Sequence, residues 1–129
     1  MHTTTMLRAE TPDQVFRLFA ESLGAADLDA ALGLFDEHAV LVPRPGEQVS
    51  GLDAIRDALA PVFGLRARMT GELQTLLEAD GIAFVANRWR IEGVGPDGAA
   101  VALEGTTADV VRRQPDGRWL LLIDNPWGG

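Results

Sequence analysis

Acid–base chemistry in this chain depends on carboxylates and two histidines, because other common catalytic side chains are missing. The sequence has no Cys and no Tyr, and all 11 of its basic residues are Arg. Without Cys or Lys there is no thiolate nucleophile, no Cys-ligated zinc and no Schiff-base lysine. Without Tyr there is no phenol to donate a proton to an oxyanion. The groups that remain are His2, His38 and the Asp and Glu side chains.

Asp109 is the first candidate for proton transfer. Strand alternation places its side chain on the same face as Thr107 and Val111. If that face is the inner one, burial raises the pKa of the carboxyl group and suits it to act as an acid or a hydrogen-bond donor. The alternative is an outward Asp109 paired with Arg112, Arg113 or an Arg of another strand.

Asp124 is the second candidate. Alternation groups it with Leu120 and Leu122 on an apolar face, and an Asn-Pro pair follows it. One interpretation is a carboxylate inside a pocket. The other is an Asp that ends the strand and accepts hydrogen bonds from nearby backbone. If both carboxyl groups face inward, Asp109 and Asp124 belong to the same pocket.

His38 could act as a base near neutral pH. However, Asp36 and Glu37 precede it at a junction between two predicted elements, which is typical of an exposed His with acidic neighbours. A single His beside two acids lacks the ligand spacing of a zinc site. We therefore expect no metal, and no cofactor is indicated.

Ligand contacts are expected from one face of a long strand and from the first helix. Asn87 and Trp89 share a strand face with Val85 and Ile91, which we place inward, whereas the Arg and Glu side chains between them face outward. Trp127 follows the last strand and could close the mouth of a pocket; the other Trp residues are expected in the core and at its rim. The predicted ligand-binding residues are Phe16, Phe19, Asn87, Trp89, Thr107 and Trp127.

The second half of the chain predicts an antiparallel meander. Three Asp-Gly pairs, each between runs rich in β-forming residues, indicate tight hairpin turns. Three turns imply four strands, which we place near residues 66–78, 82–93, 99–113 and 118–125.

The first half predicts helices. Thr11 is placed to cap a helix that stops at Gly24, and Asp27 to cap a second, shorter one. A short strand over 39–42 precedes a third helix, which Ser50 caps and Pro61 ends or kinks. Helices collected before a meander favour an α+β domain whose curved sheet wraps the helices and leaves a pocket between them. We expect a flexible N-terminus over residues 1–10 and a single domain over 11–129.

Five stretches carry a family resemblance. They are GAADLDAALGLF at 24–35, AVLV at 39–42, GLDAIR at 51–56, RRQPDGRW at 112–119 and IDNPW at 123–127. With them the chain resembles the nuclear transport factor 2-like superfamily, and within it the SnoaL-like and ketosteroid-isomerase-like group. The resemblance implies a cone-shaped antiparallel sheet around N-terminal helices, a cystatin-like roll. It also places Asp109 at the position of the isomerases' oxyanion-binding Asp.

The sequence departs from that group at two catalytic positions. The isomerases' general-base Asp lies just before a Pro after the short first strand, where this chain has Val42 before Pro43. Their oxyanion Tyr is also absent. Ketosteroid isomerase activity itself is therefore not expected, since losing a general base typically costs about 10²–10⁴-fold in rate.

These observations predict a SnoaL-like pocket protein that binds a small apolar organic molecule, with carboxylate-based acid/base chemistry of the isomerase, cyclase or hydratase type. The alternative is a non-catalytic ligand-binding or dimerisation module of the same fold. The net charge of −8 disfavours nucleic acid and anionic membranes. The sequence shows neither a signal-peptide pattern nor an apolar run long enough for a membrane span, so we expect a cytoplasmic protein. The last strand is apolar on both faces, and the resemblance favours a homodimer through the convex face of the sheet.

Overall fold

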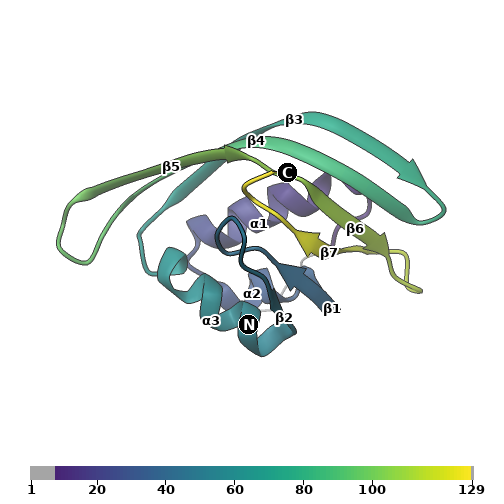
Figure 1. Ribbon diagram of the computed structural model, residues 1–129, viewed down its shortest axis with the longest axis horizontal. Coiled ribbons are helices and arrows are strands. Elements are labelled where there is room, and N and C mark those ends of the chain that lie inside the picture. Colours follow the sequence, from purple (N-terminus) through teal and green to yellow (C-terminus); the bar gives the residue numbers. More distant parts are fainter. Residues whose placement is uncertain (1–7, 129) are drawn as a thin grey trace, which may run out of the picture.

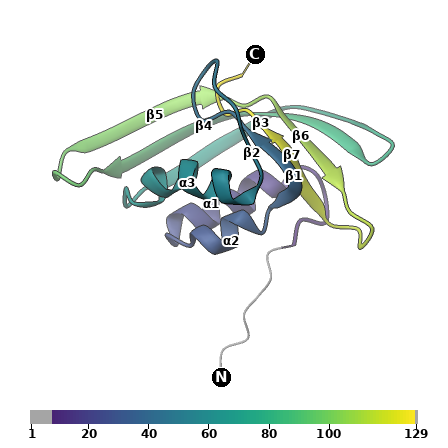
Figure 2. The same ribbon diagram turned by 60° about the horizontal axis from the view of Figure 1, so that its bottom comes forward.

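The chain folds as the predicted α+β domain in a computed structural model that describes residues 8–128. Its helices and strands are α1 (Gln14–Gly24), α2 (Leu28–Leu32), β1 (Phe35–Leu41), β2 (Val49–Ser50), α3 (Leu52–Phe63), β3 (Arg68–Ala79), β4 (Ile82–Val94), β5 (Ala100–Thr106), β6 (Asp109–Arg113) and β7 (Trp119–Asp124). The curved sheet arches over the helices without closing into a barrel (Figures 1 and 2).

The strand order is β2-β1-β7-β6-β4-β3, and β5 pairs with the second half of β4. The β1–β7 pair is parallel and the other pairs are antiparallel. Strand β4 is long enough to pair along its first half with β6 and along its second half with β5. Strand β4 therefore lies between β3 on one edge and β6 and β5 on the other.

The helix starts are only partly as predicted. Asp27 caps α2, since its Oδ1 accepts a hydrogen bond from the Ala30 amide at 3.0 Å. The predicted Thr11 cap is wrong: α1 begins at Gln14, whose Oε1 accepts instead from the Glu10 amide at 2.8 Å.

The start of α3 also differs. Ser50 belongs to β2, and Gly51, with φ of 87°, precedes the helix. Few residues other than Gly tolerate that backbone, so the turn from β2 into α3 depends on Gly51. The helix ends two residues after Pro61, at Phe63.

The strand predicted over 99–113 is broken into β5 and β6. At the break, the Thr107 amide donates to the Asn87 carbonyl and the Ala108 amide to the Asn125 carbonyl, both at 2.8 Å. The chain thus leaves β5 and becomes a separate strand between β4 and β7.

The core fills the space between the helices and the inner face of the sheet. Val15, Leu23, Ile55 and Val111 are among its fully buried side chains. Of the N-terminal segment 1–10, residues 1–7, including His2, lie outside the described residues. Ala9 is buried, and its carbonyl accepts a hydrogen bond from the Trp119 amide at 2.9 Å.

Candidate functional site

A cavity of about 240 Å³ lies between the inner face of the sheet and helices α1 and α3. It exceeds the roughly 150 Å³ that holds benzene and is smaller than the roughly 300 Å³ at which drug-sized sites begin. The structure brings all the sequence-predicted site residues together on its wall, namely Phe16, Phe19, Asn87, Trp89, Thr107, Asp109, Asp124 and Trp127.

The wall is mostly apolar. Val85, Trp89 and Ile91 line it from β4, as alternation predicted, while the Arg and Glu side chains between them are exposed. The ring of Phe16 lies against β3 at Gly71, where an added Cβ would collide with it. A glycine at this strand position therefore lets α1 approach the sheet.

Asp109 faces the cavity, so the outward alternative does not hold. Its side chain is 6% exposed, and its Oδ1 accepts a hydrogen bond from the Asn125 amide at 2.9 Å. Arg112, the partner considered in that alternative, instead binds Asp36 on the other side of the sheet.

Asp124 reaches the cavity because β7 contains a bulge. The neighbouring residues 110 and 111 of β6 pair with Ile123 and Leu121, which leaves Leu122 without a partner. The extra residue shifts the alternation, so Leu121 and Asp124 both line the cavity. The predicted grouping of Asp124 with the even-numbered leucines is therefore wrong, although its side chain is inside.

The two carboxyl groups form one electrostatic unit. Burial raises the pKa of Asp109 well above its ordinary value, and the nearby charge of Asp124 and a hydrogen bond between the two groups raise it further. Burial also raises the pKa of Asp124, to about 6, against the lowering effect of its hydrogen bond with Asp109. The stronger rise at Asp109 makes it the group of the pair that holds a proton more tightly, and Asp124 the group that ionises more readily as the pH rises.

Asn87 and Thr107 complete the polar part of the wall. The Thr107 hydroxyl oxygen accepts a hydrogen bond from the Asn87 backbone amide at 2.9 Å. The Asn87 side chain is 4% exposed, yet its Nδ2 has no hydrogen-bond acceptor among the described residues. Val85 pairs with Asp109, so Asn87, two residues further along β4 on the same inward face, lies beside the carboxyl pair.

Residues 125–128, here called the C-terminal strap, lie at the rim of the cavity. The Trp127 indole donates to the Pro43 carbonyl at 3.0 Å, and the Trp89 indole donates to the Pro126 carbonyl at 2.7 Å. The two indole rings pack edge to face with centroids 5.5 Å apart. The Asn125 amide donates to Asp109, so the C-terminal strap is hydrogen-bonded both at the rim of the cavity and to the carboxyl pair.

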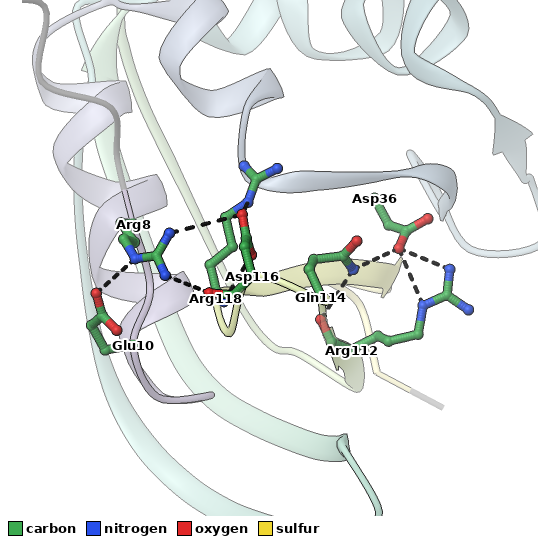
Figure 3. Close-up of polar contacts among 7 residues, drawn as sticks. All are labelled: Arg8, Glu10, Asp36, Arg112, Gln114, Asp116 and Arg118. Atoms are coloured by element: carbon green, nitrogen blue, oxygen red, sulfur yellow. Dashed lines mark hydrogen bonds and ion pairs between the residues drawn. The ribbon is translucent and has the colours of Figure 1, made fainter.

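His38 does not belong to the site. Its side chain is 74% exposed beside Glu37, as its acidic context indicated. Asp36 is buried on the outer side of the sheet, where its Oδ2 binds Arg112 Nη2 at 2.8 Å and Gln114 Nε2 at 2.9 Å (Figure 3). This cluster joins β1 to β6 and the turn that follows it.

Within residues 8–128 no group of three His, Asp or Glu side chains could hold a metal ion. Across the same range, no helix has the length and apolar character needed to cross a membrane. The absence of a cofactor and a cytoplasmic location stay predictions.

Sequence reasoning missed part of the wall. Ala58, Leu59 and Val62 of α3 and Met69 of β3 line the cavity. The helical spacing of Leu59 and Val62 was visible in the sequence, but it indicates only an inward face. Whether an inward side chain meets core or cavity depends on the distance between helix and sheet, which the sequence pattern does not contain.

Comparisons with known proteins agree with this architecture. The model of the SnoaL-like domain family matches residues 15–121. No curated protein matches the sequence at a significant level.

Three solved structures have the same fold. A conserved protein from Planctomyces limnophilus is 16% identical with a TM-score of 0.77, and the match covers 91% of this chain and 90% of that one. A ketosteroid isomerase-like protein from Erwinia carotovora atroseptica is also 16% identical, with a TM-score of 0.75 and coverages of 87% and 88%. An NTF-2 like protein of unknown function from Shewanella oneidensis is 19% identical, with a TM-score of 0.69 and coverages of 87% and 92%.

Proposed function

The chain belongs to the SnoaL-like domain family, and we propose that its cavity binds a small apolar organic molecule and performs carboxylate-based acid/base chemistry on it. The observation that carries the proposal is the pair Asp109 and Asp124, two buried carboxyl groups that line the same, otherwise largely apolar, cavity. A cavity of about 240 Å³ fits a molecule of one or two rings.

The chemistry follows from the different environments of the two groups. Asp124, whose pKa is raised to about 6, suits the role of the base at neutral pH, and the stronger rise of the Asp109 pKa suits Asp109 to the role of the proton donor. In the proposed step Asp124 removes a proton from carbon next to a carbonyl group, and Asp109 gives its proton to the oxygen that gains the electron pair. A proton passing across their shared hydrogen bond restores the starting state. Isomerisation and cyclisation both use such a step, whereas hydration needs an added water.

The position of Asp124 supports its assignment as the base. Val42 stands where the resembling isomerases have their base, and its amide donates to the Asp124 carbonyl at 2.9 Å. Asp124 thus lies on β7, the strand beside the position of Val42, and its side chain lines the cavity. We infer that it supplies from β7 the function that β1 lacks.

The experiment measures exchange of the α-protons of 2-indanone for deuterium, a direct readout of proton abstraction from carbon. We expect catalysis by the wild type that falls as the pH drops through about 6, the pKa of Asp124. In Asp124→Asn the rate should fall about 10²-fold or more. An exchange rate unchanged by this substitution would contradict the catalytic role.

Ala58→Phe tests the location of binding, because Ala58 lines the cavity and a larger side chain fills it. Ala60→Phe, an exposed position on the same helix, is the matched control. We expect indane binding, measured by ligand-observed NMR, to be lost in Ala58→Phe and kept in Ala60→Phe. Equal binding by both variants would place the ligand elsewhere.

The second candidate is a non-catalytic binding module of the same fold, which the absence of a base at Val42 and of any Tyr favours. It predicts that wild-type protein binds indane but does not exchange the protons of 2-indanone. It also predicts that Asp109→Asn and Asp124→Asn keep ligand affinity within a few-fold.

We propose, finally, that the protein works as a homodimer joined through the outer face of the sheet. Leu77, Phe84, Val110 and Ile123 pair across β3, β4, β6 and β7 in one row. Leu77 is 64% exposed, and Phe84 and Ile123 are 37% and 39% exposed. A contiguous exposed apolar row of this kind favours a protein partner.

A further inference from the structure

Among residues 8–128, the cavity wall presents side-chain acceptors and no free side-chain donor. The indole N–H groups of Trp89 and Trp127 both donate to backbone carbonyls at the rim, at 2.7 and 3.0 Å. The Thr107 hydroxyl donates to a backbone carbonyl of β4 at 3.5 Å. The Nδ2 of Asn87 is buried beyond the reach of a ligand, so this amide presents its oxygen to the cavity. A ligand that forms hydrogen bonds to these side chains must therefore bring the donor itself.

The two carboxyl groups on this wall have no cation beside them. The described residues that line the cavity include no Arg and no His, whereas Asp109 and Asp124 are only 6% and 8% exposed. Asp36, the other buried Asp of the described chain, shows the contrast, because its Oδ2 binds Arg112 Nη2 at 2.8 Å on the outer side of the sheet (Figure 3). The fold thus pairs one buried carboxylate with a cation and leaves the two in the cavity without one.

Buried negative charge favours a ligand that brings positive charge. A carboxylate in an apolar site without a partner is unfavourable, and burial accordingly raises the pKa of Asp109 and Asp124. Because the fold has already removed these groups from water, a bound cation attracts them without a second desolvation of the carboxylates. A primary ammonium group also has three N–H donors and no acceptor, which matches two carboxyl groups and the Asn87 oxygen. A hydroxyl group donates only one hydrogen bond and leaves the charge uncompensated.

We propose that the cavity is a binding site for a protonated amine, whose ammonium group lies on the pair Asp109 and Asp124 and whose apolar body contacts Phe16 and Phe19. The cavity volume of about 240 Å³ limits that body to one or two rings. The inference goes beyond the proposed function, since it adds a cationic class of ligand and holds whether or not the cavity is catalytic. An ammonium group on Asp124 occupies the proposed base, so a bound amine competes with a ketone for the site.

The test uses three probes with the same ring skeleton. 2-Aminoindane is protonated at neutral pH, as a Lys side chain is, whereas 2-indanol carries a neutral hydroxyl group and indane carries neither. Their affinities for the wild type are measured at pH 7 by ligand-observed NMR. We expect the amine to bind about 30-fold more tightly than 2-indanol, because it alone brings the missing charge. Equal affinities for the amine and the alcohol overturn the inference.

A double variant, Asp109→Asn with Asp124→Asn, removes both carboxyl groups with little change in shape. We expect it to bind 2-aminoindane about 30-fold more weakly and to keep indane affinity within a few-fold, which shows that the cavity persists. The matched control is Asp53→Asn with Asp80→Asn, two exposed positions on α3 and in the turn between β3 and β4. It removes the same charge from the surface and should leave amine affinity nearly unchanged. An equal loss in both double variants, or a loss in neither, overturns the site.

A second measurement uses the wild type alone. Asp109 and Asp124 are the titratable side chains among the described residues that line the cavity, and an alkylamine stays protonated between pH 5 and 7. We expect the affinity for 2-aminoindane to rise about tenfold over this range as Asp124, with a pKa of about 6, ionises, and the affinity for indane to stay constant. A flat profile for the amine overturns the inference.

The indane measurement separates the two proposals. Indane binding without a preference for the amine overturns this inference alone and leaves the proposed binding function standing. If neither indane nor 2-aminoindane binds, both fail.

Discussion

Asp124 illustrates at the residue scale how a site group can oppose folding. In the folded protein burial raises the pKa of Asp124 to about 6, whereas an unfolded chain gives it the ordinary value of 3.8. Between these values the folded state binds more protons than the unfolded state. The free energy of unfolding therefore decreases as the pH rises through this window, and the stability of the protonated form is fully present only below it.

Asp124→Asn should consequently stabilise the protein at neutral pH. The amide carries no buried charge, so we expect the free energy of unfolding to rise by about 2 kcal/mol at pH 7. Below pH 4, where Asp124 is protonated in both states, the difference between variant and wild type should shrink toward zero. Urea denaturation at several pH values measures the stability difference at pH 7 and its decrease below pH 4. A variant less stable than wild type at pH 7 would refute the claim that the buried charge of Asp124 opposes folding.

Asp36 has the opposite pH dependence. Burial alone would raise its pKa, but hydrogen bonds from the His38 amide, Arg112 and Gln114 outweigh burial and hold the pKa below its ordinary value. The stability that the ionised Asp36 contributes is present above the unfolded value of 3.8 and is lost as the pH falls through the lower folded value.

At the element scale the buried Asp36 carboxylate links β1 to β6 through its hydrogen bonds with Arg112. Asp36 lies where the pairing of β1 with β7 is irregular, between the positions of Phe35 and Val40. We expect Asp36→Asn to lower the free energy of unfolding at pH 7 by about 1–2 kcal/mol, a moderate value because Arg112 is partly exposed. Asp53→Asn, an exposed change on α3, is the control.

The measurement is denaturant unfolding of both variants at pH 7 and near pH 3. The decrease in the free energy of unfolding caused by Asp36→Asn should be smaller at the lower pH, because wild-type Asp36 begins to take up a proton there. A loss of equal size at both pH values would mean that the hydrogen-bond geometry, and not the charge, holds the strands together.

Regular elements were predictable from the sequence, and irregular ones were not. Alternation placed Asn87 and Trp89 inward because β4 keeps its own alternation there, since the extra residue of the β3–β4 pairing belongs to β3, between Leu73 and Thr75. It failed at Asp124 because a bulge in β7 shifts the phase, and a bulge depends on how neighbouring strands pair. The break at Thr107 has the same origin, since it forms where the chain changes partners. Local patterns therefore identified the cavity residues but did not determine how they converge.

At the scale of the whole molecule, the order of helices and Asp-Gly turns sufficed to predict an α+β domain with a curved sheet. The unpaired amide of Asn87 was not predictable, because it requires knowledge of every nearby acceptor. The absence of Cys, Lys and Tyr leaves proton transfer to His, Asp and Glu side chains, and the fold places two Asp side chains in one cavity. The composition thus limits which side chains can transfer protons, and the fold determines that two of them lie in the cavity.

The proposed dimer is a prediction about the whole molecule. Phe84→Glu places a charge in the middle of the apolar row on the outer face, and we expect it to convert a dimer into a monomer at micromolar concentration. Val94→Glu introduces the same charge at an exposed position at the far end of β4 and should leave the dimer intact. Sedimentation velocity distinguishes the two species, and a wild-type protein that sediments as a monomer would rule out the interface.

The central claim is that the cavity holds one protonated and one ionised carboxyl group at neutral pH. The most direct measurement is a ¹³C NMR titration of the side-chain carboxyl groups, with Asp109→Asn and Asp124→Asn used for assignment. We predict that the Asp124 signal titrates near pH 6 and that Asp109 remains protonated through neutrality. Titration of both groups near their ordinary value of about 4 would contradict the account.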